Sequence, residues 1–482
     1  MKRTKFLSSV LPVANPALRS VMAWRVFAVA VGSALLTSPA FAQQAPDPQA
    51  AAPTVETPAA NADSSTGDAA AQPAEASTNA NSSKSGTDIF SRDTFTVLLD
   101  GRFVVADGEK SWIDGGFGKT RFGGTNDEDY KVRAVPVEAT AAWMPRFTNS
   151  LSANISGGWQ RGQQHHADLI EAFLNFLPPQ HGSIGFSARA GLMWPEISLE
   201  HATGGVWSTV YTITPSAINS WVGEEVKPIA LEGTLHAGIG QHQFAATGAI
   251  FAFNDTSGTL LSFRGWALHD IKATAFGHFP LPPLNDFMKF AQQDQTRSLI
   301  ELDNRPGFYG RLEWRPPWPF GASVFYYDNR GDPKVFNKNL QWGWRTRFWN
   351  VGLNADLGPN TRLLAQGMTG STIMGFETNS VPWVHTHFRS AYVLVSQTID
   401  DKTAVTGRVE AFGTRERGSQ MSPDESEHGW SWTAAVRHSL TNNLALFVEA
   451  LNVRSRRGTR ERIGLDPFQA QTVFQAALRF TL

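Results

Sequence analysis

QTVFQAALRFTL, residues 471–482, ends the chain with side chains that alternate between two different faces. One face is wholly apolar and carries Phe474, Ala476, Leu478, Phe480 and Leu482. The other carries Gln475, Ala477, Arg479 and Thr481. Alternate residues of an extended strand point to opposite sides, so the pattern predicts a strand between an apolar and a polar environment. A length of about ten residues is typical of a transmembrane β-barrel strand, whereas soluble strands usually have about five or six.

The same alternation recurs upstream, so the prediction extends to a whole barrel. It is found in 95–105, 149–160, 183–194, 307–315 and 429–440. Several of these segments place a charge in mid-strand, such as Arg102 and Arg189. Such a charge is costly in a dry protein core but costs little beside a water-filled lumen. We therefore predict an all-β fold, a transmembrane antiparallel β-barrel.

The connections between these segments alternate in length. Short turns are predicted at 145–149, 178–182, 238–242, 315–321, 357–361, 399–403 and 440–444. Long loops are predicted at 195–225, 279–306, 329–342, 371–384, 414–428 and 454–470. Barrels of the bacterial outer membrane have short periplasmic turns and longer external loops, which places both ends of the barrel in the periplasm. The count is 18 strands, with 16 as the alternative, because a weak segment such as 272–280 is easily split or merged.

The residues before the barrel predict export and then a tail. Residues 1–42 read as a signal peptide: a basic start, the apolar run 26–36, and an Ala-x-Ala cleavage site ending at Ala42. Residues 43–92 are rich in Ala, Pro, Ser and Thr and have no apolar periodicity, which predicts a disordered periplasmic tail. The barrel is expected to span 93–482, and the predicted location is the outer membrane, reached through the periplasm.

Composition and motifs argue against several other classes of protein. The net charge of -1 is unlike that of a nucleic-acid binder, and the absence of cysteine fits an oxidising compartment. Neither G-x-S-x-G nor H-E-x-x-H occurs, so we expect no enzyme. HHAD, residues 165–168, lacks a third metal ligand nearby, and no metal or cofactor is predicted.

DGGFGKTRFGG, residues 114–124, resembles a phosphate-binding P-loop at first sight. Ile113 stands where the motif needs its first glycine, and a turn-forming stretch follows where the motif needs a helix. We interpret it as a glycine-rich segment at or near the first external loop. Its glycines would serve turns and close backbone approach, and Lys119 and Arg121 would add positive charge near the pore mouth.

The body of the chain resembles the Gram-negative outer-membrane porins, in the branch of phosphate-selective and carbohydrate-selective porins. The resemblance rests on the last strand, the first strand FTVLLDGRFVV (95–105), and ARAGLMWPEISLEH (188–201). The chain departs from the family at Leu482, where members end in Phe. The resemblance implies a passive diffusion channel for small hydrophilic solutes or anions, and a homotrimer.

In such porins the third external loop folds into the barrel and narrows the pore, and 195–225 occupies that position here. The candidate constriction residues are Glu196, Glu200, Trp207, Tyr211, Trp221, Glu224 and Glu225. The candidate pore-lining residues are Arg102, Arg189, Arg264, Arg311, Arg408, Arg437 and Arg479. Acids facing arginines would set a transverse field that sorts solutes, giving an anion or sugar preference.

A competing hypothesis is that these arginines brace the wall by pairing with inward acids. Those acids would be Asp100, Glu232, Glu313, Glu410 and Glu449.

Alternative functions for the same barrel are a polysaccharide exporter and an outer-membrane enzyme. A plugged transporter would need about 22 strands and a compact plug, which the tail cannot form. RSRRGTRER, residues 454–462, predicts a cationic external segment. It would bind the phosphates of lipopolysaccharide, draw anions to the mouth, or simply be solvated.

Overall fold

The computed structural model describes residues 86–126, 130–180, 182–202, 204–421 and 423–482. The predicted signal peptide and most of the predicted tail lie outside the described residues. Within the described chain, no helix is both long enough and apolar enough to cross a membrane.

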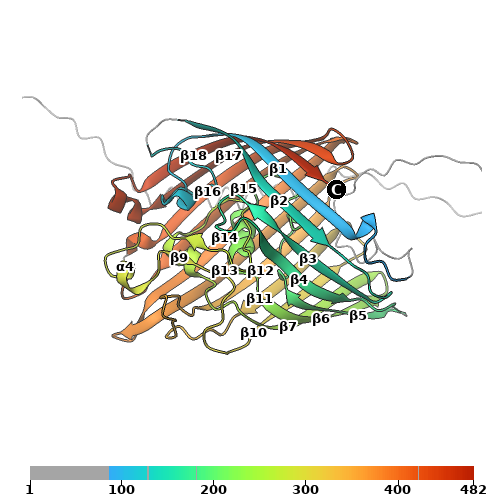
Figure 1. Cartoon of the computed structure of the whole chain (residues 1–482), viewed down its shortest axis with the longest axis horizontal. Helices are drawn as coiled ribbons and strands as arrows, with labels where there is room; N and C mark the ends of the chain where they lie inside the picture. Colours follow the sequence, from blue (N-terminus) through green and yellow to red (C-terminus); the bar gives the residue numbers. More distant parts are fainter. Residues whose placement is uncertain (1–85, 127–129, 181, 203, 422) are drawn as a thin grey trace, which may run out of the picture. The chain divides into compact units, whose positions relative to one another are not determined.

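In the described residues, sixteen antiparallel strands close into a barrel (Figure 1). They are β1 (Phe95–Ala106), β2 (Lys131–Trp143), β3 (Leu151–Gln160), β4 (Asp168–Phe176), β5 (Ile184–Leu192), β6 (Ile229–Ile239), β7 (His242–Ala252), β10 (Gly307–Arg315), β11 (Phe320–Asp328), β12 (Arg345–Asp356), β13 (Thr361–Thr378), β14 (Val381–Asp400), β15 (Thr403–Glu416), β16 (Glu427–Ser439), β17 (Leu444–Arg457) and β18 (Phe468–Thr481). Each strand pairs with its chain neighbour, and β1 closes the ring against β18.

The predicted count of 18 strands is wrong, and the alternative of 16 is confirmed. The difference lies in 253–306, which joins β7 to β10 without contributing a barrel strand. The predicted strand 272–280 is irregular except at its end, where β8 (Phe279–Pro280) pairs with β9 (Gln295–Thr296) in a separate small sheet. The alternation there marks side chains buried inside the barrel, which a periodicity argument cannot tell from a wall strand.

The remaining elements are short helices in the connections. They are η1 (Arg92–Thr94), η2 (Trp112–Asp114), α2 (Ala217–Glu225), α3 (Thr259–Phe263), α4 (Met288–Ala291), η3 (Pro423–Glu425) and η4 (Gly458–Ile463).

The predicted faces of the strands are confirmed. On β18, Phe474 and Leu478 are 50% and 48% exposed on the outer wall, while Gln475 and Ala477 between them are buried. The last strand is locked at the seam, because Leu482 donates its backbone N–H to the carbonyl of Val97 at 3.0 Å. In Figure 1 the blue strand β1 lies beside the red strand β18.

Short turns gather at one end of the barrel and long connections at the other, called here the short-turn end and the long-loop end. One predicted long loop, 371–384, is wrong. Strands β13 and β14 continue to Thr378 and Val381, and Asn379 and Ser380 turn the chain with φ of 53° and 65°. Two residues with positive φ form the tight hairpin turn that matches strand twist.

Three connections from the long-loop end fold into the barrel and are called the inner segments: 107–126, 193–228 and 253–306. Side chains of the second and third segments join those of the wall in a buried cluster that includes Trp221, Trp266, Phe348 and Phe388, while Trp112 of the first packs in a second buried cluster. The inside of this barrel is therefore packed with protein where a water-filled lumen was expected.

Candidate functional site in the barrel lumen

The helix α2 of segment 193–228 is held by carboxylates of the barrel wall. The Ser216 hydroxyl caps the helix by accepting from the N–H of Asn219, and Glu410 on β15 accepts from the N–H of Ala217 at 2.7 Å. Acidic groups at a helix N-terminus satisfy its free N–H groups and interact favourably with its dipole. On the same helix, Trp221 is fully buried, with ring centroids 5.3 Å from those of both Phe348 and Phe388.

Arg408 on β15 links this segment to the wall. Its guanidinium contacts Glu200 at 2.8 Å and Glu410 at 3.2 Å, and donates to the carbonyl oxygens of Thr214 at 2.8 Å and Pro215 at 3.1 Å. The side chain is completely buried. Arg408 therefore faces the lumen, as predicted, but its donors are occupied by protein groups.

Glu224 and Glu225 connect α2 to the segment 253–306. Glu224 binds Arg264 through two contacts of 2.6 and 2.7 Å and lies 2.8 Å from His269. Burial alone would raise the pKa of Glu224, but these two partners outweigh it and lower the pKa. Arg264 was predicted on the barrel wall. This is wrong, because it directly follows α3 inside the barrel and is completely buried.

The glycine-rich segment 114–124 also lies inside the barrel. A Cβ on Gly123 would be 2.4 Å from the carbonyl oxygen of Glu109, so close backbone approach explains this glycine. The Lys119 ammonium is buried against Glu427 and donates to the carbonyl of Arg264 at 2.9 Å. The expectation that Lys119 adds charge near the pore mouth is wrong, because an ammonium with buried partners is withdrawn from solvent.

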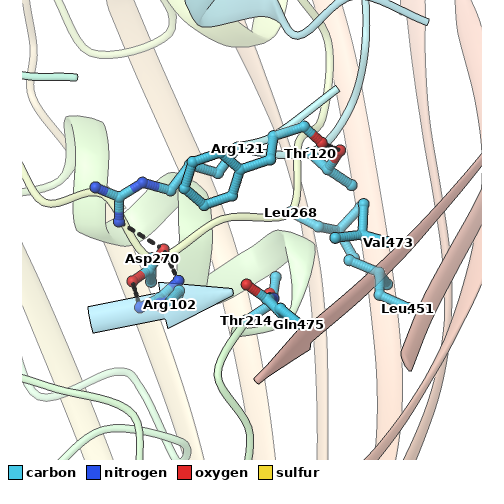
Figure 2. Close-up of a pocket in the computed structure, with 10 residues that line it drawn as sticks. Arg102, Thr120, Arg121, Thr214, Leu268, Asp270, Leu451, Val473 and Gln475 are labelled. Carbon is cyan, nitrogen blue, oxygen red and sulfur yellow. Dashed lines mark hydrogen bonds and ion pairs between the residues drawn. The ribbon is translucent and has the colours of Figure 1, made fainter. Parts of the chain in front are cut away.

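A second buried ion cluster joins the segments 107–126 and 253–306 to the wall (Figure 2). Asp270 lies between Arg102 at 2.5 Å and Arg121 at 2.9 Å, and both guanidinium groups point toward it in Figure 2. Asp100 takes the other side of Arg102 at 2.9 Å and also pairs with Arg479 at 3.0 Å. Arg121 is thus a buried bracing residue, contrary to its predicted place near the mouth.

The cavity beside this cluster has a volume of about 10 Å³. A cavity needs about 10–15 Å³ to hold a single water molecule. Its lining is Arg102, Thr120, Arg121, Phe122, Thr214, Leu268, Asp270, Leu451, Val473 and Gln475. This cavity therefore has room for about one water molecule and for no larger solute.

A smaller part of the predicted site is reachable. Arg189 and Arg311 have side chains that are 15% and 16% exposed, and Glu196 between them is 45% exposed. The guanidinium of Arg189 lies 3.1 Å from Glu196, and that of Arg311 lies 3.6 Å from it. Arg189 is the main cause of a lowered pKa of Glu196, so the carboxylate stays charged.

Two further carboxylates and one further arginine complete this group, called here the lumen charge cluster. Glu232 lies 2.7 Å from Arg189, and Glu313 lies 2.9 Å from Arg311 and 2.8 Å from Arg315. The members are Arg189, Glu196, Glu232, Arg311, Glu313 and Arg315. Three positive and three negative groups leave the cluster without a charge surplus.

The aromatic residues predicted for the constriction separate in the structure. Trp221 is buried, whereas Trp207 and Tyr211 are half-buried at the edge of the core. Trp207 stacks on His201 and Trp194, with ring centroids 3.5 and 4.4 Å apart. Two rings of this stack, His201 and Trp194, are buried, and Trp207 is the partly exposed one.

One predicted arginine differs from the others. Arg437 on β16 is half-buried, and within the described parts of the chain no carboxylate lies within 4.0 Å of it. The other six each have such a partner, which is the arrangement that the competing hypothesis of a braced wall expects. Asp100, Glu232, Glu313 and Glu410 take part in these pairs. Glu449 instead accepts from the N–H groups of Ile213 and Thr214, at 2.7 and 3.0 Å.

Comparison with known proteins gives the same architecture. No protein-family model and no curated protein sequence matches the chain. Among solved structures, the outer membrane channel DcaP of Acinetobacter baumannii is 9% identical, with 82% of this chain and 98% of that chain covered and a TM-score of 0.50. The chain has the fold of the outer-membrane porins. Identity this low establishes the fold alone.

Two other solved structures cover the chain to a similar extent. An anion-selective porin from Comamonas acidovorans is 10% identical, with 82% of this chain and all of that chain covered and a TM-score of 0.45. OprB of Pseudomonas putida is 10% identical, with 80% and 94% covered and a TM-score of 0.45. A closed barrel with an apolar outer wall is the architecture of outer-membrane proteins, and it places this porin-fold chain in the outer membrane.

Several residues of the porin-fold lumen escaped the sequence analysis. Asp270, Glu427 and Glu109 each hold a buried cation: Arg102, Lys119 and Arg460 respectively. Glu109 and Arg460 lie 351 positions apart in the chain. No local sequence pattern predicts an ion pair between residues so far apart, because each residue by itself resembles a solvent-exposed charge in a loop.

Metal-capable groups in the described residues do not involve the HHAD segment. Asp255, Glu301 and Asp303 have carboxylate oxygens within 4.8 Å of one another. His165 instead lies beside His278, with ring centroids 6.5 Å apart.

Raising the pH from 5 to 7 is expected to weaken the packing of α2. Burial raises the pKa of Glu225 from 4.5 to about 7, although the carboxyl accepts from the N–H of Leu260 and from Trp221. The folded protein therefore holds a proton that the unfolded chain releases, and this stabilisation is present below pH 4.5 and lost as the pH rises through about 7. One such group contributes at most about 1.4 kcal/mol per pH unit.

Urea unfolding of the folded barrel between pH 5 and 7 measures this effect. Glu225→Gln should reduce the pH slope without abolishing it, because burial also raises the pKa of Asp255 to about 7. An unchanged slope in Glu225→Gln would show that Glu225 does not titrate in this range.

Proposed function

We propose that this chain is a passive outer-membrane channel for small hydrophilic solutes with little net charge, of the size and polarity of simple sugars. The observation that carries the proposal is the lumen charge cluster. A partly exposed group of equal numbers of guanidinium and carboxylate groups offers donors and acceptors to hydroxyl groups without favouring either sign of ion.

The segment 193–228 is proposed to narrow the path. Glu196, which contacts the reachable Arg189 and Arg311, stands on this segment, and so do the half-buried rings of Trp207 and Tyr211. Aromatic rings and paired charges on one segment suit a sugar ring, which presents an apolar face and a rim of hydroxyl groups. The inner segments leave little space, so the proposed channel has a small conductance.

Pairing of the arginines supports a neutral solute over an anion. The guanidinium groups of Arg102, Arg264 and Arg408 are buried in contacts with carboxylates. A buried, neutralised guanidinium adds little to the potential that an ion meets in the pore. Arg437 is the remaining member of the predicted set, and one cation is a weak basis for anion selectivity. Assembly as a homotrimer remains part of the proposal, to be tested by the mass of the protein in detergent.

Planar-bilayer recording together with liposome swelling tests the proposal. We expect small conductance steps, a reversal potential near zero in a KCl gradient, and swelling in simple sugars that falls steeply with solute size. Strong anion selectivity would refute the preference for neutral solutes. The absence of both conductance and swelling would refute the channel itself.

Neutralising two acids of the cluster should make the channel prefer anions. In Glu196→Gln/Glu313→Gln the three arginines of the cluster lose two of their three counter-charges. The excess positive charge attracts anions in the narrow lumen, and the reversal potential should shift toward that of chloride.

Asp401→Asn/Glu377→Gln is the matched control, since both residues are exposed and lie outside the cluster. It removes the same charge and should leave the reversal potential unchanged. Equal shifts in the two variants would assign selectivity to overall charge and not to the lumen charge cluster.

A further inference from the structure

Basic residues gather on the outer wall near the long-loop end, where a membrane protein is expected to be apolar. They lie on five strands of one side of the barrel: β12, β14, β15, β16 and β17. The residues, called here the basic belt, are Arg345, Arg347, His385, His387, Arg389, Arg415, His428, Arg454 and Arg456. Eight of the nine are exposed, and His385 is half-buried.

Strand register shows that the belt faces outward. On β12, Arg345 and Arg347 share a face with Trp349, which is 54% exposed on the outer wall, while Thr346 and Phe348 between them are buried inside. Cross-strand partners point to the same side of a sheet. Because Trp349 pairs with Thr369 and Thr369 pairs with Arg389, Arg389 faces outward like Trp349. The same step along the register from β12 to β17 places the other belt residues on the outer face.

The level of the belt is set by the residues below it on each strand. On β12 the order from the long-loop end is Arg345, Arg347, Trp349, Val351, so two cations precede an aromatic ring and then aliphatic side chains. On the other side of the belt, the guanidinium of Arg454 lies 5.4 Å from the ring centroid of Trp430. Aromatic rings mark the membrane–water boundary, so the belt stands at the level of lipid head groups.

Like charges face one another within the belt. His387 is the cross-strand partner of Arg415, and His428 is the partner of Arg456. Such pairs are destabilising unless an anion lies between them. Within the described residues, no carboxylate lies within 4.0 Å of Arg345, Arg347, Arg415, Arg454 or Arg456. The single acid among the cross-strand neighbours is Asp328, at the edge of the belt opposite Arg347.

The opposite side of the barrel lacks this feature. The outward positions of β1 to β7, β10 and β11 hold no arginine or lysine in the described chain. At the corresponding end of β1 they are Phe103 and Val105. Scattered solvation would distribute cations around the whole circumference, so their restriction to one side indicates a specific partner.

We propose that the basic belt binds the phosphate groups of lipopolysaccharide in the outer leaflet of the outer membrane. Arginine forks match phosphate oxygens with two parallel hydrogen bonds, and neighbouring strands bring several forks within reach of one phosphorylated head group. The long-loop end is the external end of outer-membrane barrels, where this lipid resides. The belt thus binds a lipid from outside, independently of what passes through the lumen.

The structure also divides the cationic segment 454–462 that stood out in the sequence. Arg454 and Arg456 point outward into the belt. Arg457 and Arg460 are buried, the former beside Glu425 and the latter beside Glu109. Two arginines of that segment therefore belong to the basic belt, and two others form buried contacts inside the protein.

Binding of lipopolysaccharide to the purified, folded barrel tests the proposal. The test variant is Arg347→Gln/Arg415→Gln/Arg454→Gln/Arg456→Gln, whose changed side chains all lie on the outer surface. The control variant Lys289→Gln/Arg305→Gln/Lys334→Gln/Lys338→Gln removes the same charge from exposed residues of the long-loop end. The three probes are lipopolysaccharide, its dephosphorylated form and inorganic phosphate.

Each arginine near an anionic surface contributes about fivefold, so the test variant should bind lipopolysaccharide about 600-fold more weakly than the unchanged protein if the four effects multiply, and at least about tenfold more weakly if they overlap. The control variant should bind as the unchanged protein does, and the dephosphorylated lipid should bind weakly to all three. Equal binding by the test and control variants would overturn the proposal. So would equal binding of the dephosphorylated lipid, or displacement by millimolar inorganic phosphate, which would indicate a small-anion site.

Discussion

Arg408→Met should lower the free energy of unfolding by about 3–5 kcal/mol and increase the channel's conductance. The change leaves the carboxylates of Glu200 and Glu410 buried without the guanidinium that lies 2.8 and 3.2 Å from them. Removing one partner of a buried ion pair costs this much because the remaining charge cannot regain its water. The carbonyl oxygens of Thr214 and Pro215 also lose a donor, so segment 193–228 loses its link to β15.

Urea unfolding in detergent and single-channel recording measure the two effects. Arg437→Met is the matched control, because it makes the same chemical change at another lumen-facing position that has no carboxylate within 4.0 Å in the described chain. It should cost less than about 1 kcal/mol, as a substitution does when it breaks no buried network. If Arg408→Met were no more harmful than Arg437→Met, the link between segment 193–228 and the wall would not be stabilising.

Trp221→Ala should also destabilise the barrel by about 3–5 kcal/mol. The ring is fully buried on α2 and packs against Trp266, Phe348 and Phe388. Truncation removes its buried apolar surface and leaves a cavity lined by large rigid rings, which cannot collapse to fill it. The hydrogen bond that the indole N–H of Trp221 donates to Glu225 at 2.7 Å is lost as well.

The same unfolding assay measures this change, and Trp318→Ala is the control. Trp318 is 56% exposed at the short-turn end and packs on Phe320, outside the lumen. It should cost about 1 kcal/mol or less. We also expect Trp221→Ala to give larger and noisier currents, because α2 is no longer fixed against segment 253–306 and the wall. Silent channels with unchanged stability would contradict the packing role of this ring.

Much of the barrel wall was predictable because its signal is local. Alternation in QTVFQAALRFTL specifies a face for every residue from Phe474 to Arg479, and the structure keeps each assignment. The strand count failed at 253–306, because buried residues such as Ala273 and Ala275 alternate inside the barrel as wall residues do. The hairpin at Asn379 and Ser380 was missed because its strands continue into polar sequence beyond the apolar band.

The candidate site was predictable as a set of residue types but not as a set of partners. Arg408 was placed on the lumen face by alternation, and Glu200 was assigned to the loop by its position. Their contact joins residues 208 positions apart, and nothing in either neighbourhood specifies it. Arg264 was misplaced for the same reason, since its pairing with Glu224 depends on where two separate connections meet.

The sequence by itself determined which side of a wall strand meets the apolar band of the membrane, because that band tolerates only apolar side chains and the constraint repeats at every second residue. Only the tertiary structure decided what fills the lumen. An inward arginine is satisfied equally by water, by an acid on a neighbouring strand or by a carbonyl of an inner segment. Polar residues at alternate positions therefore indicate only that hydrogen-bonding partners are present. The identity of those partners depends on how the barrel closes and on how three connections fold into it.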